Sequence, residues 1–492
     1  MDHVIFPKVP MLAQNFCAGE WSTGGGERRE ILSPLNGQVI GHYHESNPSD
    51  ILHGVEQAER AFQGWRQTPL KDRCQIMFRL RDILLRDRDK MIATISLENG
   101  KTQSEALGSF MKGIEVLEYA LSLQNIDDLA RLQVSRGVYC EYRREPLGVV
   151  AGITPFNFPA MVPMWTIPIA LTLGNCYLWK PSEKTPLTAK FIAQAAVEAG
   201  LPAGVFSIIQ GGRETVEAII DHPLVAAIAF VGSSRVAKAV YQRGTNLGKR
   251  VLALGGAKNH ILLLPDADGI LAGIGIADSF TGCAGQRCMA ASVLLAVGNC
   301  APIIEKIKER AAAMVLGESM GAIISSEQRD FLNAAIARAE AAGAKILLDG
   351  RRPQAPQGMQ GGYWLAPTIL DHVPAAGEAA QVELFGPILS IIRCQTISQA
   401  IAIENSSAYG NAAAVFTSNG ALADKVVAAL QAGMVGINIG VPVPREPFSF
   451  GGINASKFGH GDITGGASLD FWSNLKKVTT KWEQQKDHNW MS

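Results

Sequence analysis

One cysteine of the chain lies in a setting that suits a nucleophile. Cys288 follows Gly285 and Arg287 in the segment Gly-Cys-Ala-Gly-Gln-Arg-Cys-Met. The glycine permits close backbone approach, and the adjacent guanidinium can stabilise a thiolate. Cysteine is also among the most buried residue types, and this segment taken alone is better explained by a structural cysteine.

An amide side chain follows a predicted buried strand. Asn157 lies in the turn Thr154–Pro159, directly after the apolar run 148–153. At that place an asparagine can donate a hydrogen bond to an oxyanion that develops during a reaction. An asparagine that only closes its own turn explains the same pattern.

Two further segments have the residue types of a nucleotide site. Lys180 stands at the carboxyl end of a predicted parallel strand, where open α/β sheets bind ligands, and could hold a ribose or a phosphate. Residues 230–237 predict a strand, a turn at Gly232 and a helix start after Ser233, which would present helix amides to a pyrophosphate. The turn lacks the G-x-G-x-x-G fingerprint. An exposed lysine and a plain turn capped by Ser233 remain the alternatives.

An alternation of apolar strands and helices predicts the scaffold for these residues. The expected strands are 149–153, 177–180, 205–209, 226–231, 260–264, 293–296, 412–416 and 434–438. Helices 188–198 and 233–243 supply crossovers between them, so we expect a mostly parallel sheet covered on both faces. The first part of the chain is helical, with a helix capped by Ser49 or Asp50 and another over 73–96.

Two places mark changes in organisation. A boundary is expected near Gly255 and Gly256, where one strand-helix series ends and a second begins, and 351–362 reads as a surface loop of the second series. The segment 470–482 alternates enough to be a strand that reaches outside its own domain. A solvated charged tail fits that segment equally well.

Composition excludes several classes of function. The 492 residues suffice for about three domains. Lys+Arg and Asp+Glu both number 45, so the formal net charge is zero. There is no excess of positive charge that would indicate binding of nucleic acid. Eight scattered cysteines without CxxC pairs offer no zinc site or disulfide framework, and no metal is expected. Residues 1–10 lack a secretory signal, so a cytoplasmic location is expected.

One long segment without charged residues could be taken for a membrane-spanning helix. No charged residue lies between Leu147 and Trp179, which is longer than a membrane helix requires. Four prolines interrupt this segment, at 155, 159, 163 and 168. A lipid-facing helix would lose several backbone hydrogen bonds there, so we interpret the segment as two buried strands around an apolar helix, with no membrane contact.

Together these segments resemble the aldehyde dehydrogenase superfamily over nearly the whole chain and in the right order. The matching segments are Thr154–Pro159, Lys180–Glu183, 230–233, 254–256, 285–288 and 383–387. The resemblance implies an α/β fold with a Rossmann-type NAD-binding domain, an α/β catalytic domain and a small oligomerisation element.

The resemblance also implies roles for individual residues. Cys288 would be the nucleophile, and Asn157 with the Cys288 backbone amide would form the oxyanion hole. Lys180 and Glu183 would hold the adenosine ribose, and Glu383 and Phe385 the nicotinamide end. The other coenzyme contacts expected by this likeness are Thr154, Phe156, Lys184, Gly232 and Ser233. The expected walls of the substrate tunnel are Phe158, Val162, Trp165 and Phe450.

One departure from the superfamily pattern bears on the reaction. Most members have a glutamate directly before Leu-Gly-Gly, where it is the general base for hydrolysis of the thioester, and this chain has Ala253. Without that base, attack by water should be slow, because general-base catalysis contributes about 10²- to 10⁴-fold. A thiol such as coenzyme A is a stronger nucleophile near neutral pH and would be the better acceptor.

The run 255–260, Gly-Gly-Ala-Lys-Asn-His, resembles the CoA-acylating methylmalonate-semialdehyde dehydrogenase branch in particular. That likeness implies NAD as cofactor, CoA as co-substrate, and loss of the β-carboxylate of methylmalonate or malonate semialdehyde. Arg287 is the candidate partner of the substrate carboxylate, because a guanidinium matches it in bidentate geometry.

Three positions depart from that branch. Gln286 replaces the usual Glu, Lys112 stands where Arg is frequent, and Arg445 with Glu446 lies in a loop that is usually more apolar. Lys112 keeps the charge but loses the fork of a guanidinium. Arg445 would either contact the substrate carboxylate or be an exposed loop charge.

Two other functional readings are open. A hydrolytic aldehyde dehydrogenase would need another carboxylate in place of the missing base. A non-catalytic relative is disfavoured, because packing alone does not require Cys288, Asn157, Lys180 and Glu383 together.

The resemblance predicts a division into three parts. An NAD-binding domain would comprise 1–123 and 147–254, and a catalytic domain 255–445. A bridging element of 124–146 and 446–492 would join subunits into a homotetramer. Glu183 accepts hydrogen bonds from a ribose 2′-hydroxyl and repels a 2′-phosphate, which favours NAD over NADP.

Overall fold

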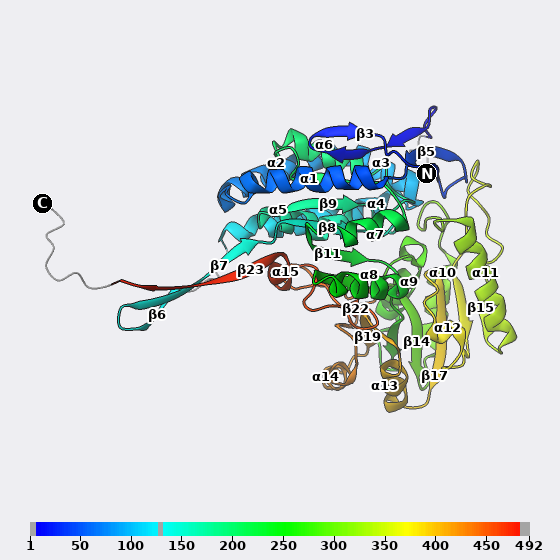
Figure 1. Cartoon of the computed structure of the whole chain (residues 1–492). Coiled ribbons are helices and arrows are strands. Elements are labelled where there is room, and N and C mark those ends of the chain that lie inside the picture. Colours follow the sequence, from blue (N-terminus) through cyan, green and yellow to red (C-terminus); the bar gives the residue numbers. More distant parts are fainter. Residues whose placement is uncertain (1–5, 126–130, 483–492) are drawn as a thin grey trace, which may run out of the picture.

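The computed structural model describes residues 6–125 and 131–482, and its chain builds two large sheets (Figure 1). The parts of the expected NAD-binding and bridging regions at 1–5, 126–130 and 483–492 lie outside the described residues.

The first sheet has a parallel centre with antiparallel strands at both edges. Its order is β22-β12-β11-β8-β9-β10-β2-β3. The parallel strands are β8 (Val149–Ile153), β9 (Cys176–Lys180), β10 (Phe206–Ile208), β11 (Val225–Val231) and β12 (Arg250–Leu254). The antiparallel strands are β2 (Asn15–Cys17), β3 (Glu20–Ser22) and β22 (Lys457–Phe458). Strand order therefore reverses between β8 and β11, where parallel α/β sheets form their ligand crevice.

Helices cover this sheet and bury its central strands. They are α1 (Pro48–Trp65), α2 (Leu70–Arg86), α3 (Arg88–Asn99), α4 (Gln103–Ser122), α5 (Met161–Thr172), α6 (Ala189–Glu198), α7 (Arg213–Asp221) and α8 (Ser234–Asn246). β8 and β9 are buried at every residue, which explains the uncharged run in the sequence. Within the described residues, no helix is long and apolar enough to cross a membrane.

The second sheet has the order β15-β16-β17-β14-β13-β19-β20 and is parallel except for β15. Its strands are β13 (Asn259–Leu263), β14 (Ala291–Val297), β15 (Lys345–Leu348), β16 (Thr368–Asp371), β17 (Ile388–Cys394), β19 (Ala412–Phe416) and β20 (Met434–Ile437). Its helices are α9 (Gly269–Thr281), α10 (Ala301–Ala312), α11 (Ser326–Ala341), α12 (Glu378–Gln381), α13 (Ile397–Asn405) and α14 (Gly420–Ala429). The chain passes from the first sheet to the second between Leu254 and Asn259.

Smaller elements complete the fold. One three-stranded sheet consists of β1 (Met11–Ala13), β5 (Val39–His44) and β4 (Arg28–Leu32), and one pair of β18 (Tyr409–Gly410) and β21 (Ile453–Asn454). Two single turns of 3₁₀ helix are η1 (Leu123–Asn125) and η2 (Gly282–Gly285).

A three-stranded arm extends away from the two large sheets (Figure 1). It is formed by β6 (Arg131–Ser135), β7 (Val138–Pro146) and β23 (Ser473–Lys481), all antiparallel. The strand prediction for the C-terminal segment is confirmed over 473–481, and the solvated-tail alternative is wrong. Residues 470–472 instead end helix α15 (Ala467–Trp472).

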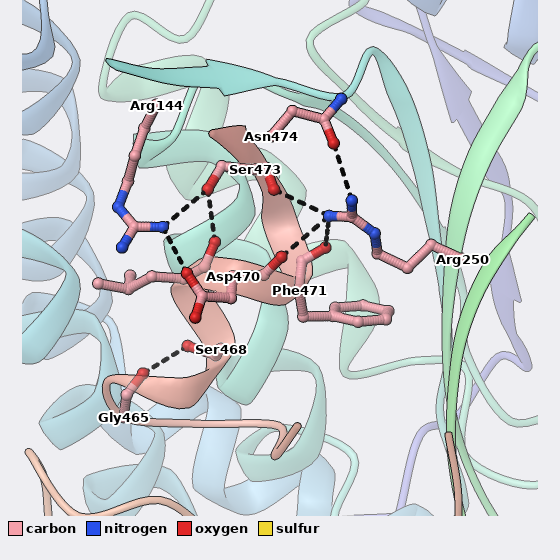
Figure 2. Close-up of polar contacts among 9 residues, drawn as sticks. Arg144, Arg250, Gly465, Ser468, Asp470, Phe471, Ser473 and Asn474 are labelled. Atoms are coloured by element: carbon pink, nitrogen blue, oxygen red, sulfur yellow. Dashed lines mark hydrogen bonds and ion pairs between the residues drawn. The ribbon is translucent and has the colours of Figure 1, made fainter. Parts of the chain in front are cut away.

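Arg250 fastens the start of β23 to the first sheet, and Arg144 holds the same place from within the arm (Figure 2). The Arg250 guanidinium, at the start of β12, donates to four oxygens at 2.8–2.9 Å: the carbonyls of Asp470, Phe471 and Ser473 and the side chain of Asn474. Arg144 of β7 donates to Asp470 Oδ1 at 2.8 Å and to Ser473 Oγ at 3.1 Å. The end of α15 and the start of β23 are thus held from both sides.

The eight strands predicted from the sequence are confirmed, with ends within two residues. β16 and β17 were not predicted. The helix over 73–96 is wrong as one element, because α2 ends at Arg86 and α3 starts at Arg88. The cap of α1 is Asn47, not Ser49 or Asp50. The Asn47 side chain accepts from the Asp50 amide and Asp50 bonds back, which forms a capping box.

Candidate active site

A cavity of about 970 Å³ lies at the carboxyl ends of the first sheet, at the reversal of strand order. It is lined by the loop after β8, the end of β9, the turn between β11 and α8, and the chain between β12 and β13. The segment that leads into β14 and the loop before β17 close its far side. The cavity therefore lies between the two sheets.

The cavity collects most of the site residues expected from the sequence. Those that line it are Thr154, Phe156, Asn157, Phe158, Val162, Lys180, Glu183, Gly232, Ser233, Cys288, Glu383 and Phe385. Lys184, Trp165, Phe450 and Arg287 are not among the lining residues. Residues far apart in the chain thus meet at one place.

Cys288 follows a turn with unusual backbone geometry. Cys283 and Ala284 have φ angles of 55° and 52°, and Gly285 has 68°, all in the left-handed region. A Cβ on Gly285 would lie 2.1 Å from the Gly386 carbonyl oxygen, so only glycine fits. Burial raises the pKa of the Cys288 thiol to about 12, and the Glu383 carboxylate adds to this shift. In the free protein the thiol is therefore protonated at neutral pH.

Asn157 reaches the segment that carries the cysteine. Its side-chain Nδ2 donates to the Gln286 carbonyl oxygen at 3.1 Å, and the residue is only 5% exposed. An amide has two N–H groups, and this bond uses one of them. The second is available to an oxyanion formed beside Cys288.

The coenzyme side of the cavity carries a pair of opposite charges. Lys180 Nζ donates to Glu183 Oε2 at 3.0 Å. Burial opposes ionisation of Glu183, but the positive charges of Lys180 and Lys184 and the hydrogen bonds to the carboxyl together outweigh it and lower the pKa of Glu183. The carboxylate is thus ionised at neutral pH and can accept hydrogen bonds from ribose hydroxyls.

The turn after β11 leaves helix amides open to the cavity. Ser233 precedes α8 but its side chain caps no amide of the helix. Gly232 lies against the ring of Phe230, two residues earlier, since a Cβ on Gly232 would lie 2.5 Å from that ring. Arg213 and Arg235, which sequence reasoning missed, also line the cavity. This end of the cavity suits a pyrophosphate.

Aromatic rings border the cavity near Lys184. The rings of Phe156 and Phe385 meet edge to face, with centroids 5.9 Å apart. Lys184 Nζ lies 5.9 Å from the centre of the Phe156 ring, within reach of a cation–π interaction, but Lys184 does not line the cavity itself. Thr154 is fixed by a hydrogen bond from Trp179 Nε1 at 2.8 Å.

A buried carboxyl lies close to the cysteine. Glu383 Oε1 accepts a hydrogen bond from the Ala257 amide at 2.8 Å, and burial raises its pKa to about 7. The next residue, Lys258, is 3% exposed, and its ammonium has no hydrogen-bond partner among the described residues. Burial lowers the pKa of Lys258 to about 7. The sequence marks the run that contains Lys258, but it does not indicate that Lys258 lies near Glu383.

The expected tunnel walls divide into two groups. Phe158 and Val162 line the cavity, and Lys101 Nζ lies 4.4 Å from the Phe158 ring centre. Trp165 and Phe450 are 2% and 4% exposed and stack on each other with centroids 4.5 Å apart. That mutual packing keeps both rings out of the cavity.

The expected carboxylate partner, Arg287, is only partly bonded, since its Nε is buried and has no hydrogen-bond partner among the described residues. Arg287 Nη2 donates to the Asp278 and Ser279 carbonyl oxygens at 2.5 and 2.9 Å, at the end of α9. Lys112 donates to Glu446, Glu115 and the Pro444 carbonyl at 2.7, 3.0 and 3.4 Å. Arg445 is 81% exposed and pairs with Glu115, so it is an exposed loop charge in this structure.

No cluster of three or more His, Cys, Asp or Glu side chains suited to a metal ion occurs in residues 6–125 and 131–482. The residues that do gather at the cavity include a thiol, the Asn157 amide, a lysine, arginines and carboxylates, which suit a nucleotide coenzyme and a covalent acyl intermediate.

Comparison with known proteins agrees with this arrangement. The model of the aldehyde dehydrogenase family matches residues 21–478. Malonate-semialdehyde dehydrogenase of Halalkalibacterium halodurans is 37% identical over 483 residues, which cover 95% of this chain and 98% of that protein. Malonate-semialdehyde dehydrogenase 2 of Oceanobacillus iheyensis is 38% identical over 482 residues, with 95% and 98% covered.

Solved structures give the same result. Methylmalonate-semialdehyde dehydrogenase from Oceanimonas doudoroffii superposes with a TM-score of 0.94 at 35% identity, covering 96% of this chain and 99% of that one. A Sinorhizobium meliloti protein in complex with NAD superposes with a TM-score of 0.95 at 32% identity, covering 97% and 99%. The resemblance and the fold class expected from the sequence are confirmed, and the chain belongs to the aldehyde dehydrogenase family.

Proposed function

We propose that the protein oxidises malonate semialdehyde or methylmalonate semialdehyde with NAD and transfers the acyl group to coenzyme A. The β-carboxylate leaves as CO₂ or bicarbonate, and the products are acetyl-CoA or propionyl-CoA and NADH. One observation carries the acylating chemistry: the position before Leu254 and the cavity-lining glycines is Ala253, a buried residue of β12 without any basic group.

Cys288 and Asn157 have separate roles in the proposed reaction. The Cys288 sulfur bonds to the aldehyde carbon and its proton passes to solvent water, while the oxyanion receives hydrogen bonds from Asn157 Nδ2 and the Cys288 amide. Bound NAD would supply the acceptor for the hydride, held in the cavity by Lys180, Glu183 and the amides after Ser233. The bond between the α-carbon and the β-carboxylate then breaks, CO₂ leaves, and the α-carbon takes up a proton from water. The CoA thiolate attacks the acyl carbon, and the Cys288 thiolate leaves. Without a glutamate at 253, water is a poor competitor for this thioester.

Several observations support binding of NAD in the cavity. The Lys180–Glu183 pair suits the adenosine ribose, and the uncapped amides after Ser233 suit the pyrophosphate. Glu383 and Phe385 lie near Cys288, where the nicotinamide must be. Since the ionised Glu183 repels a 2′-phosphate, we expect NAD to be preferred over NADP.

The domain roles follow the same proposal. The first sheet with its helices would be the NAD-binding domain, and the second the catalytic domain. The arm exposes Leu132, Val134 and Tyr142, which are 63%, 57% and 48% exposed. An unpaired strand edge with apolar side chains suits pairing with another subunit, so we propose a homotetramer built through this arm.

We also propose a cytoplasmic enzyme. All eight cysteines are free thiols, which is typical of a reducing compartment.

The direct test measures NADH formation by the purified protein with malonate semialdehyde, methylmalonate semialdehyde and propanal, with and without CoA, and identifies the acyl product by mass. We expect sustained turnover only with CoA. Equal turnover without CoA, giving a free acid, would contradict the proposal. Cys288→Ser should abolish turnover in either case.

A hydrolytic reaction is the second candidate, and Glu383 is the observation that favours it. Its carboxyl lies close enough to raise the pKa of Cys288, and its own pKa of about 7 suits a general base. If Glu383 activates water, Glu383→Gln should abolish the free-acid product, while NADH still forms in a first turnover because the glutamine amide can still hydrogen-bond the coenzyme.

A further inference from the structure

Two buried amide side chains converge on the backbone of the nucleophile. The Cys288 carbonyl oxygen accepts a hydrogen bond from Asn259 Nδ2 at 2.7 Å and another from Asn411 Nδ2 at 2.9 Å. Both asparagines are 5% exposed. Neither lines the cavity, so neither is placed to touch substrate or coenzyme.

The register of the second sheet brings these two amides together. β13 and β19 are parallel neighbours in which His260 pairs with Ala413, so Asn259 lies opposite Ala412. The Ala412 amide donates to Asn259 Oδ1 at 3.1 Å, which orients the side chain with its nitrogen toward Cys288. Asn411 directly precedes β19 and therefore points to the same place.

The two amides hold more than one peptide unit. Asn259 Nδ2 also donates to the Ala290 carbonyl oxygen at 2.9 Å, and Asn411 Nδ2 lies 3.2 Å from Met289 Sδ. The three residues 288–290 are thus tied to the starts of β13 and β19 just before they enter β14.

The segment needs such fixation because the turn before it is strained. Residues 283–285 all have positive φ angles, two of them without being glycine. Such a backbone persists only where its surroundings over-determine it. On the other side, Asn157 binds the Gln286 carbonyl, so bonds to 286, 288 and 290 bracket the thiol.

We propose that Asn259 and Asn411 are positioning residues that fix the orientation of the Cys288 thiol for attack. This inference rests on the proposed function, because it takes Cys288 as the nucleophile. A small displacement of a reacting group can cost about 10²-fold in rate. Loss of either donor should therefore slow thiol chemistry more than it affects coenzyme binding.

The test uses Asn259→Asp and Asn411→Asp, which keep the shape of the side chain but lose the donor. Asn175→Asp is the matched control. Asn175 is also fully buried, and its amide also donates to two carbonyl oxygens, those of Ala170 and Trp472, but far from Cys288 along the first sheet. For each folded variant, three quantities are measured: the rate of Cys288 alkylation by iodoacetamide, mapped by mass spectrometry, the burst of NADH, and the KM for NAD.

We expect Asn259→Asp and Asn411→Asp to slow alkylation and the burst at pH 8 by about 10- to 100-fold, with little change in the KM for NAD. Lowering the pH protonates a buried aspartic acid and restores a donor, so the rates relative to wild type should recover toward pH 6. The Asn175→Asp control should show no such recovery. Asn411→Ser, which keeps a hydroxyl donor, should lose less than Asn411→Asp.

Unchanged alkylation and burst rates in both variants, with only a lower Tm as in Asn175→Asp, would overturn the inference. Failure of the proposed function is recognised separately. If Cys288→Ser retains turnover, Cys288 is not the nucleophile, whatever the two amides do to its alkylation rate.

Discussion

The carboxylate of Glu383 lies directly against the backbone of Gly256. A Cβ on Gly256 would lie 2.1 Å from Glu383 Oε2, and the following amide, that of Ala257, donates to Oε1 at 2.8 Å. The glycine therefore makes room for the carboxyl, and the peptide that follows it holds the carboxyl beside the cavity.

Gly256→Ala should displace Glu383 from this position. We expect kcat to fall by about 10²-fold and the KM for NAD to rise, because Glu383 is proposed to hold the nicotinamide end. Steady-state kinetics with a thermal melt checks this. Gly108→Ala on α4 is the control, since a Cβ there meets nothing within 4 Å. Wild-type kinetics in Gly256→Ala would show that the position of Glu383 does not matter.

The buried Lys258 and Glu383 should give a distinctive pH dependence of stability. The pKa of Lys258 is lowered to about 7 by burial, so above pH 7 the unfolded state binds more protons and the free energy of unfolding rises with pH. The pKa of Glu383 is raised to about 7, so below pH 7 the folded state binds more protons and the free energy of unfolding falls as pH rises. Together these two groups give a minimum in the free energy of unfolding near pH 7.

Lys258→Met should remove the rising part of this profile. The expected rise in wild type between pH 7 and 9 is about 2 kcal/mol, since one proton is worth about 1.4 kcal/mol per pH unit. Urea unfolding of both proteins at several pH values measures it. A profile in Lys258→Met that still rises as steeply as wild type would assign the effect to other groups.

The ion pair of Lys112 and Glu446 should influence which aldehydes are preferred. All three ammonium protons of Lys112 are used, and the two side chains are 16% and 9% exposed. Lys112 and Arg445 balance the charges of Glu115 and Glu446, so Glu446→Gln gives this group of side chains a net charge of +1. We therefore expect kcat/KM for malonate semialdehyde to rise about tenfold relative to that for propanal, a gain that corresponds to about 1.4 kcal/mol.

Two controls belong to this prediction. Lys112→Met in the Glu446→Gln background should cancel the gain. Arg445→Met should leave the ratio unchanged, because Arg445 is 81% exposed and an exposed ion pair contributes about 0–1 kcal/mol. If the ratio of kcat/KM for the two aldehydes is unaltered in Glu446→Gln, the charge of Lys112 does not affect the choice of substrate.

Arg250→Met should weaken the attachment of the arm. Its guanidinium serves three carbonyl oxygens and Asn474 (Figure 2), and loss of these bonds should lower the free energy of unfolding by about 1–3 kcal/mol. If the arm joins subunits, the subunits of the variant should also separate at protein concentrations at which the wild type is still assembled. Analytical ultracentrifugation measures this. Arg243→Met, which removes only exposed pairs to Glu217 and Asp221, is the control and should keep the assembly.

Much of the fold follows from local patterns in the sequence. Buried parallel strands are largely apolar, so β8 and β19 stand out as short uncharged runs between turn residues. β9 and β13 are apolar except at one end, where β9 ends on Lys180 and β13 begins with Asn259 and His260. The break between α2 and α3 is less visible, because no proline or glycine marks Asp87. β17 is apolar as well but follows an irregular stretch, and without a helical pattern before it the strand was missed.

The identity of the reactive groups is likewise a property of the sequence. Cys288, Asn157, Lys180 and Glu383 are recognisable by residue type and by the short segments around them, and so is the absence of a glutamate at 253. What the side chains contact was decided by tertiary structure alone. Asn411 meets the Cys288 carbonyl across 123 residues of chain, Glu446 meets Lys112 across 334, and Trp165 turns to Phe450 instead of the cavity. Such contacts arise where sheet register and packing bring distant segments together, and no local periodicity encodes them.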